Sequence, residues 1–354
     1  MILPSACVSD CGSAVILARN LAALFRMERI DTAICAGRSS RFSDISFFEA
    51  PEPISFSPRP NYGTTVEEYL RSHGALSHSY LSRDYAAIEA AVLEFHPDLL
   101  FEIERPAAIA AAKQHALPVY SIISPAAFRN RNFRADTMNG LNSFLNEQDM
   151  EQVLRLRELY EYSHCFVFGP EEFRFFIPDF EVTPLGISSI SPLGSESDGR
   201  ISIVMNDTKL SSAKRRCVFT EAFLGAPYDV FVYARGLRPA HNGNLHIQSQ
   251  IRLSALNNSR TVIHDGCDAI TNYCTALSIP QVIIHDDSWQ RSWNAACLKR
   301  SGAGLAVPET EFSMQSVYET FRMVVADDSF AANAARLKEE TDALGDLSRI
   351  LSFL

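Results

Sequence analysis

Residues 97–123 contain the pattern that decides the fold: Pro97-Asp98-Leu99-Leu100-Phe101-Glu102, then Pro106-Ala107-Ala108-Ile109-Ala110-Ala111-Ala112-Lys113, then Pro118-Val119-Tyr120-Ser121-Ile122-Ile123. The first and third segments are short apolar runs of strand length, and the second is an Ala-rich segment of helical length. Strand, helix and strand fit within about 30 residues, as a crossover between parallel strands requires. The stretch therefore predicts a βαβ unit in an α/β fold.

The same alternation continues on both sides of this stretch. Upstream, residues 32–36 predict another strand. Residues 184–199 concentrate Pro, Gly, Ser and acidic residues and are typical of an interdomain linker. After the linker the alternation restarts, with strands expected at 201–205, 230–233, 261–264 and 281–285 and a short fifth near Val307. We expect residues 51–62 to form a loop and residues 150–162 a surface helix.

Length and composition agree with two soluble domains. The chain has 354 residues and a formal charge of −10, with 47% hydrophobic and 21% charged residues. At roughly 150 residues per domain, two domains are expected. The acidic balance argues against nucleic acid as a partner. The eight cysteines include no CxxC pair, which favours a reducing compartment. Neither a membrane-spanning run nor a secretion signal is evident, so we expect a cytoplasmic protein, with peripheral membrane contact left open.

Polar residues follow the predicted strands. In the second half they are 206–209, 234–236, 264–267 and 285–288, and in the first half 9–13, 102–104 and 124–125. Ligands of open parallel sheets bind beyond the carboxyl ends of the strands. A cleft between two such halves would collect charges, hydroxyls and helix N-termini, which suits an anionic ligand such as a nucleotide.

One region carries a family resemblance. It comprises Thr261-Val262-Ile263-His264-Asp265-Gly266, Thr271, Ala276-Leu277-Ser278-Ile279-Pro280-Gln281-Val282, Gln290, Trp293-Asn294-Ala295-Ala296 and Ser301-Gly302-Ala303-Gly304-Leu305-Ala306-Val307. In order, spacing and strand context it resembles the donor-binding region of nucleotide-sugar glycosyltransferases of the GT-B fold, the UDP-glycosyltransferase and MurG-like group. Pro97-Asp98-Leu99-Leu100 and Thr183-Pro184-Leu185-Gly186 resemble other parts of that family.

The resemblance implies a fold and a reaction. The fold is two Rossmann-like domains facing a cleft: an acceptor domain at 1–186, a linker at 187–199, a donor domain at 200–330, and a C-terminal helix at 331–354 that packs back on the first domain. The reaction is inverting transfer of a sugar from a nucleotide-diphosphate sugar, of UDP or dTDP type, to a hydroxyl acceptor. The acceptor is a small molecule, a glycan or a peptide. No metal is implied, and no Asp-x-Asp motif is present. The nucleotide-sugar is a co-substrate, and no cofactor is expected.

The resemblance also implies donor-binding residues. His264, Asp265 and Gly266 fall on the segment that faces the diphosphate, with Thr271 on the same helix start. Thr208 falls where a Ser or Thr follows the first strand of the donor domain, and Gln248, beside Ile247, falls where backbone groups hold the base. Gln290 falls on the Gln that contacts sugar hydroxyls. In the family an Asp precedes this Gln, and Asp286 or Asp287 would replace it here.

The chain departs from the family in two places. The Gly-rich turn is here His264-Asp265-Gly266-Cys267-Asp268-Ala269-Ile270, which loses two glycines and gains two carboxylates, while the ribose-binding Glu falls on Tyr273. In the first half, Gly12-Ser13-Ala14 replaces the family's Gly-His-Val, so Ser13 takes the place of the base. Asp10, Glu102 or Glu104 would then be the base. The alternatives are a catalytically inactive relative that binds a partner transferase, or a nucleotide-sugar epimerase.

Each of these residues also has a structural interpretation. Asp10 is a suitable helix cap, Glu102 and Glu104 can pair with Arg105, and a single His after a strand is commonly structural. Residues 128–134 interleave aromatic side chains with Arg129, Arg131 and Arg134, which suits an acidic or phosphate-bearing acceptor or, alternatively, a solvated loop. His285, Asp286 and Asp287 are adjacent and cannot all point at one ion, so no metal site is predicted.

Overall fold

The computed structural model describes residues 1–4, 13–37, 45–55, 63–174, 182–187, 199–206, 208–251 and 253–354. The chain forms two α/β units, one of Met1–Phe168 with Phe176–Pro184 and one of Gly169–Phe175 with Leu185–Leu354. The change of unit at Leu185 lies beside the predicted boundary at residue 186. Apart from Ile187 and Gly199, the predicted linker lies outside the described residues.

The first unit has a seven-stranded sheet in the order β3-β2-β1-β4-β5-β6-β7. The pairings from β3 to β6 are parallel. The order reverses direction between β1 and β4, as in a doubly wound sheet. The elements are β1 (Ile2–Pro4), α1 (Ser13–Met27), β2 (Ala33–Ala36), β3 (Ser46–Glu49), α2 (Val66–Ser72), α3 (His78–Phe95), β4 (Leu100–Ile103), α4 (Pro106–Gln114), β5 (Val119–Ile123), α5 (Asn139–Glu147), α6 (Leu156–Leu159), β6 (His164–Phe168) and β7 (Val182–Leu185), with 3-10 helices at η2 (Pro125–Phe128), η3 (Ala135–Met138) and η4 (Tyr160–Tyr162).

The predicted βαβ unit is β4, α4 and β5. Pro106 stands in the first turn of α4, where its missing N–H costs no hydrogen bond. The alanines from Ala107 to Ala112 are all buried, so small side chains let this helix pack closely on both sides. The prediction for this stretch is confirmed to within three residues at each boundary.

The predicted surface helix at 150–162 is wrong. Only the four-residue α6 and the 3-10 turn η4 form there, and Leu156, Leu159 and Tyr160 are buried. Val153 is held away from a helix by Asn142, whose side chain accepts from its N–H at 2.9 Å and donates to its carbonyl at 3.0 Å. The leucine spacing therefore belongs to a short buried turn.

The second unit has its own seven-stranded sheet, in the order β10-β11-β9-β8-β12-β13-β14. All its pairings are parallel except the β10–β11 hairpin, which the sequence did not predict. Its reversal lies between β8 and β12. The elements are α7 (Glu171–Arg174), β8 (Arg200–Val204), α8 (Ser212–Phe223), β9 (Val230–Tyr233), β10 (Ala240–Asn242), β11 (Leu245–Gln248), η5 (Leu253–Leu256), β12 (Ser259–His264), α9 (Asp268–Ala276), β13 (Gln281–His285), α10 (Trp289–Ser301), β14 (Gly304–Pro308), η6 (Glu309–Glu311), α11 (Met314–Ala326), α12 (Asp328–Ala343) and η7 (Leu347–Phe353).

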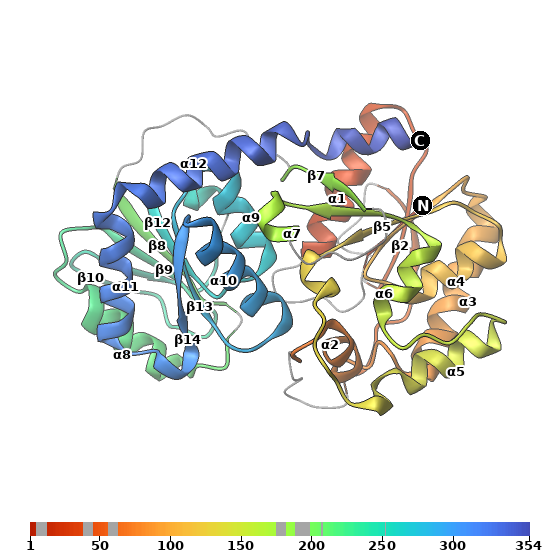
Figure 1. Cartoon of the computed structure of the whole chain (residues 1–354), viewed down its shortest axis with the longest axis horizontal. Helices are drawn as coiled ribbons and strands as arrows, with labels where there is room; N and C mark the ends of the chain where they lie inside the picture. Colours follow the sequence, from red (N-terminus) through yellow and green to blue (C-terminus); the bar gives the residue numbers. More distant parts are fainter. Residues whose placement is uncertain are drawn as a thin grey trace. The chain divides into compact units, whose positions relative to one another are not determined.

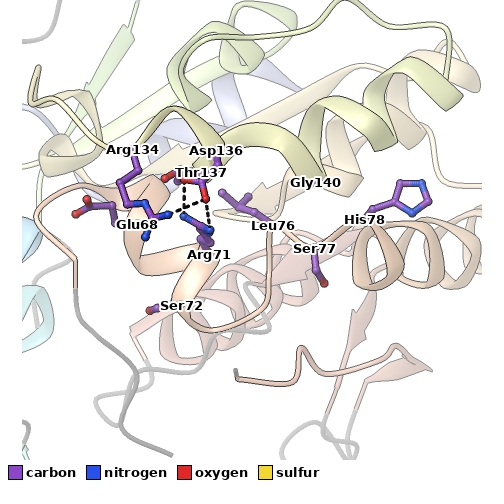
Figure 2. A pocket seen from close by; sticks show the side chains of 10 residues that line it. All are labelled: Glu68, Arg71, Ser72, Leu76, Ser77, His78, Arg134, Asp136, Thr137 and Gly140. Carbon is purple, nitrogen blue, oxygen red and sulfur yellow. Dashed lines mark hydrogen bonds and ion pairs between the residues drawn. The ribbon is translucent and has the colours of Figure 1, made fainter. Parts of the chain in front are cut away.

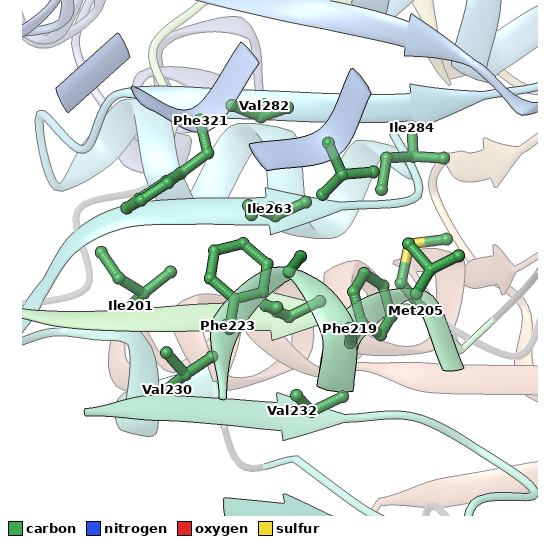
Figure 3. Close-up of a cluster of buried hydrophobic side chains, with 14 of the residues drawn as sticks. Ile201, Met205, Phe219, Phe223, Val230, Val232, Ile263, Val282, Ile284 and Phe321 are labelled. Carbon is green, nitrogen blue, oxygen red and sulfur yellow. The ribbon is translucent and has the colours of Figure 1, made fainter. Parts of the chain in front are cut away.

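The core of the second unit lies between this sheet and the pair α8 and α11 (Figure 3). Ile201 points from β8 toward Phe223 of α8, and Phe321 of α11 belongs to the same cluster. Ile201 and Ile203 of β8 are both members of this buried cluster. The opposite face is covered as well: Ser202, between the two isoleucines, is fully buried and hydrogen-bonds Ser259 Oγ at 2.7 Å. With both faces covered, the strands are almost continuously apolar, as the sequence showed.

The end of the chain is tied to the start of the second unit. Gly186 donates its N–H to Gly345 O at 2.7 Å, and a Cβ at Gly186 would lie 2.2 Å from that oxygen. Within the unit, α12 packs against α9, and the helices surround each sheet as Figure 1 shows. The packing of residues 331–354 on the first domain stays a prediction.

Candidate functional site

The polar residues of the second unit meet where the strand order reverses, at the carboxyl ends of β8 and β12. Asp265 is 1% exposed and bridges these two ends. Its N–H donates to Val204 O at 3.1 Å, and its Oδ2 accepts from the N–H of Asn206 at 3.0 Å. The carboxylate of Asp265 therefore holds the loop after β8 in place, at the position where open α/β sheets bind their ligands.

His264 is fully buried beside Asp265 and is held neutral. Its Nδ1 accepts from the N–H of Gly266 at 3.1 Å, so the proton sits on Nε2, which donates to Gln281 Oε1 at 2.9 Å. Burial lowers the pKa of His264 to about 4, although the Gln281 hydrogen bond opposes the shift. At neutral pH this imidazole carries no charge for a phosphate, and its role is to shape the turn.

The turn after His264 begins α9 with a carboxylate. Asp268, in the first turn, accepts from Gln290 Nε2 at 2.7 Å and from Asn294 Nδ2 at 2.6 Å. Gly266 has φ +78°, and a Cβ there would lie 2.7 Å from Ile283 Cγ2, so a side chain does not fit. The side-chain amide of Gln290, predicted to contact the sugar, is thus hydrogen-bonded to Asp268 in this structure.

A second group of charges lies at the carboxyl ends of β13 and β14. Lys209, whose side chain is 54% exposed, pairs with Asp286 at 2.9 Å. Burial of Asp286 works against its ionisation, but its contacts with Ser288, Arg291 and Lys209 lower its pKa overall. Thr208 donates its hydroxyl to Glu309, whose pKa is raised, mainly by burial.

A buried arginine joins the loops that follow β8 and β9. Arg215, on α8, is 6% exposed and donates to Met205 O and, at 2.9 Å, to Arg235 O. Burial lowers its pKa, and the charges of Asp265 and Glu309 oppose that shift. The guanidinium fixes both loops and adds positive charge beneath the carboxyl edge of the sheet.

Not every residue predicted for the donor site reaches this group. Thr271 is fully buried, and its hydroxyl donates to Cys267 O at 2.9 Å. Gln248 is exposed at the end of β11, and Asp287 is exposed after β13. Sequence reasoning missed Lys209, Arg215, Asp268, Arg291 and Glu309 as members of the site. The first two were recognisable as cations next to the end of β8 and on the following helix.

Two of the candidate base residues, Glu102 and Glu104, lie at the strand reversal of the first unit. Glu102, in β4, is fully buried, and its Oε2 accepts from the N–H of Arg105 at 2.7 Å. Glu104 is half-buried, with φ +55°, a conformation that non-glycine residues adopt at a cost. Asp10 and the side chain of Ser13 lie outside the described residues.

Glu102 belongs to a buried polar row. It stands opposite Ser121 of β5, which stands opposite Cys165 of β6. Burial raises the pKa of Glu102 to about 7, although the N–H and charge of Arg105 oppose the shift. The Tyr160 hydroxyl is buried nearby, and its pKa is raised by burial and by the charges of Glu102 and Glu104.

The predicted acceptor residues follow η2. Arg129 and Arg131 are both half-buried. The carbonyl of Arg131 accepts from Arg155 at 2.9 Å, and Arg155 also stacks 5.2 Å from the Phe133 ring centre. The segment 128–134 is therefore anchored by its backbone and by Phe133. Across the described ranges, no cluster of three metal-ligating side chains is found, and none of the helices described is long and apolar enough to cross a membrane.

The chain was compared with known protein families and solved structures. Residues 241–346, which include the motif-bearing region 261–307, match the family "Erythromycin biosynthesis protein CIII-like, C-terminal domain". No curated protein matches the chain in sequence. The spinosyn rhamnosyltransferase SpnG, complexed with spinosyn aglycone, superimposes with a TM-score of 0.76 at 14% identity, over 99% of this chain and 98% of SpnG. The chain has the GT-B fold.

Two further GT-B structures agree. The glycotransferase of kitacinnamycin gives a TM-score of 0.75 at 13% identity, over 99% of this chain and 97% of that one. The glycosyltransferase VinC, in complex with dTDP, gives 0.73 at 15% identity over the same shares. The predicted fold class is confirmed. The three solved structures are themselves glycosyltransferases.

Proposed function

We propose that this GT-B chain transfers a sugar from a nucleotide-diphosphate sugar, of UDP or dTDP type, to a hydroxyl acceptor. In this proposal the reaction inverts the anomeric centre and requires neither a metal ion nor a cofactor besides the nucleotide-sugar. The observation that carries the proposal is the polar group at the carboxyl edge of the second sheet. Asp265 and Asp286 of this group lie in the region that matches the family, whereas Lys209 comes from the loop after β8. The VinC structure with dTDP supports the donor class by similarity.

The second unit offers three features to a diphosphate. Lys209 is an exposed cation at the site, and the N-terminus of α9 adds a partial positive charge. Gly266 has no side chain that would hold a ligand away from the turn. In the proposal, Lys209 neutralises charge on the leaving nucleotide diphosphate. Asp287, exposed after β13, and the Oε1 of Gln290 accept hydrogen bonds from sugar hydroxyls.

For the base we favour Glu104 over Glu102. A general base must come within hydrogen-bond reach of the acceptor hydroxyl, and the carboxyl of Glu102 is fully buried and bound to the start of α4. Glu104 is half-buried at the same strand end. Asp10 remains the second candidate, because it follows β1, the strand next to β4. Deprotonation of the acceptor there would precede attack on the anomeric carbon, with the nucleotide diphosphate leaving.

The test is a thermal-shift panel of UDP, dTDP, GDP, ADP and CMP, with their sugars, without metal and then with magnesium. Binding to the folded state raises the melting temperature by mass action. We expect UDP or dTDP to give the largest shift, with no need for magnesium. A flat panel on well-folded protein contradicts the proposal, and so does a shift that appears only with magnesium.

Two lysine variants refine that test. Lys209→Met should weaken binding of the responding nucleotide about tenfold, since it removes the exposed cation. Lys299→Met is the matched control: it loses the same charge in the same unit, but from the last turn of α10, at the opposite edge of the sheet. Equal losses in both variants would mean that the nucleotide senses only net charge.

One observation favours a second candidate, an inactive relative that binds a partner. The Asp268 carboxylate in the first turn of α9 repels a diphosphate and holds the side-chain amide of Gln290. Asp268→Asn removes the charge and keeps the shape. If the native site is closed by this carboxylate, nucleotide binding should be absent in the parent chain and appear in the variant; an active transferase binds nucleotide in both.

A further inference from the structure

A cavity of about 710 Å³ lies in the first unit, between α2, the loop that follows α2, η3 and the start of α5 (Figure 2). Its volume falls within the range of small-molecule sites, about 300–1,000 Å³. The lining is strongly polar at the η3 side, and Leu76 and Gly140 form the middle of its wall. None of these residues belongs to the polar group of the second unit.

The polar end of the cavity is an arranged ion cluster. Arg71 donates through Nη1 and Nη2 to the two oxygens of Asp136, at 3.0 and 2.7 Å. Arg134 donates to the same carboxylate at 3.1 Å. The three side chains are 38%, 76% and 40% exposed for Arg71, Arg134 and Asp136. Asp136 thus fixes two guanidinium groups whose other donors are accessible to a ligand.

The cavity has no net charge at this end. Glu68 also lines it, and its Oε2 accepts from the N–H and hydroxyl of Thr64, at 2.8 and 3.0 Å. Two arginines are therefore matched by two carboxylates. Such a surface offers closely spaced donors and acceptors without a preference for a charged ligand.

Thr137 is the second, independent observation. It lines the cavity and is 2% exposed, and its hydroxyl has no hydrogen-bond partner among the residues that the structure describes. A buried hydroxyl without a partner destabilises the fold unless a ligand supplies one. On the apolar side, a Cβ at Gly140 would lie 2.2 Å from Leu76 O, so glycine lets α5 close the wall at Leu76.

We propose that this cavity binds a neutral, hydroxyl-rich small molecule, a saccharide or glycoside, which is the acceptor class of the transferase. The assignment of the ligand as acceptor rests on the proposed function, whereas the binding itself does not. The ring hydroxyls bond to Arg71, Asp136 and Thr137, and the C–H face of the ring lies on Leu76. Planar guanidinium and carboxylate groups that are held in register recognise paired hydroxyls in this way.

The experiment is saturation-transfer NMR, with titration for Kd, on the full chain. The probes are maltose (neutral), glucuronic acid (the same chemistry with a carboxylate) and 2-naphthol (an apolar aromatic alcohol). We expect maltose to bind and the other two to bind at least tenfold more weakly. Preferential binding of glucuronic acid overturns the neutral assignment, and preferential binding of 2-naphthol overturns the hydroxyl-rich one.

Variants locate the binding. Arg71→Gln should weaken maltose binding about tenfold and Thr137→Val about fivefold, the ranges for a charged and a neutral hydrogen bond. Arg134→Gln, at a 76% exposed side chain, tests the cluster without risk to the fold and should weaken binding about threefold. Arg83→Gln, on the exposed face of α3, is the matched control. Unchanged affinity in both Arg134→Gln and Thr137→Val overturns the assignment of the site.

The nucleotide panel separates this inference from the proposed function. If a nucleotide binds and maltose does not, the acceptor assignment fails alone. If maltose binds at these residues and no nucleotide binds, the cavity stands as a saccharide site while the transferase proposal fails.

Discussion

Glu102 and His264 occupy matching places in the two units. Each lies at the carboxyl end of the strand that neighbours the unit's first strand, with Glu102 opposite Leu3 and His264 opposite Val204. Both side chains are fully buried. Burial raises the pKa of Glu102 to about 7 and lowers that of His264 to about 4. Burial therefore disfavours the charged form of both side chains. It raises the pKa of the acid and lowers the pKa of the base.

The two residues differ in how completely they are hydrogen-bonded. Both ring nitrogens of His264 have partners. Glu102 Oε2 bonds to Arg105, while Oε1 has no hydrogen-bond partner among the described residues. The histidine is thus locked neutral across the physiological range, whereas the glutamate changes charge near neutral pH. The first unit therefore contains a buried carboxyl group, Glu102, that titrates near pH 7. The matching residue of the second unit, His264, does not titrate in that range.

The largest effect is expected from the buried arginine that accompanies Glu102. Arg105 and Asp84 form a bidentate ion pair at 2.6 and 3.0 Å, 2% and 0% exposed. Asp84→Ala leaves the guanidinium buried without its counter-charge, which should lower the free energy of unfolding by about 3–5 kcal/mol. Urea denaturation followed by far-UV circular dichroism measures the loss. A change below 1 kcal/mol would mean that water reaches Arg105 in the native state.

Next in size is the pH dependence caused by Glu102. The pKa of Glu102 is about 7 in the folded state, against 4.5 for a glutamate that is exposed to water, as in the unfolded chain. Between these pH values the folded state therefore binds more protons than the unfolded state. Stability from this group therefore falls as pH rises from about 4.5 to 7, by roughly 3 kcal/mol. Glu102→Gln should remove this fall and leave the variant more stable than the parent above pH 7. Exposed Glu94→Gln is the control, and an identical pH slope in the parent and Glu102→Gln would contradict the assignment.

His264 should give a slope of the opposite sign. The pKa of His264 is about 4 in the folded state, against 6.5 for a histidine that is exposed to water, as in the unfolded chain. Between these pH values the unfolded state binds more protons than the folded state. Stability from this group therefore rises with pH between about 4 and 6.5, by roughly 3 kcal/mol. His264→Asn keeps an acceptor for the Gly266 N–H and removes the titration. Trp289 and Trp293, the chain's two tryptophans, are both buried in the second unit, so their fluorescence follows this unit. Retention of the slope in His264→Asn would show that another group causes it.

The smallest effect concerns the second unit's buried arginine. Arg215 bonds to the carbonyls of Met205 and Arg235, and no carboxylate among the described residues forms an ion pair with it. Arg215→Met should cost about 1–2 kcal/mol, less than Asp84→Ala, because it removes hydrogen bonds to two carbonyls and leaves no buried charge without its counter-charge. Tryptophan-detected urea melts measure it. A cost equal to that of Asp84→Ala would remove the contrast between the paired and the unpaired arginine.

Local patterns were enough to predict the sheet architecture. Residues 97–123 formed the expected βαβ unit, and each strand expected after residue 200 appeared. The prediction failed at 150–162, where Asn142 of the preceding helix, α5, binds the backbone of Val153. It also missed the antiparallel β10 strand, whose three residues are all exposed, so no apolar pattern marks it.

The candidate site was predicted in part. The motif identified the turn at His264, Asp265 and Gly266, but it did not indicate that Asp265 joins two strand ends or that Gln290 is bound to Asp268. Those contacts link residues 22 to 59 positions apart. Of the cavity residues Arg71, Arg134 and Asp136, only Arg134 was among the sequence candidates, as part of the segment 128–134. The pairing of Arg71 with Asp136 was not predicted, because the two residues are 65 positions apart.

The sequence by itself determined the fold class, the βαβ unit of residues 97–123, the main parallel strands after residue 200, and the carboxyl edges at which polar residues gather. These follow from the period of apolar residues and from short-range chemistry, which a single segment contains. Only the tertiary structure decided which polar groups are charged. Protonation depends on burial and on partners from distant segments, and so the same kind of strand end holds a neutral histidine in one unit and a glutamate that titrates near pH 7 in the other.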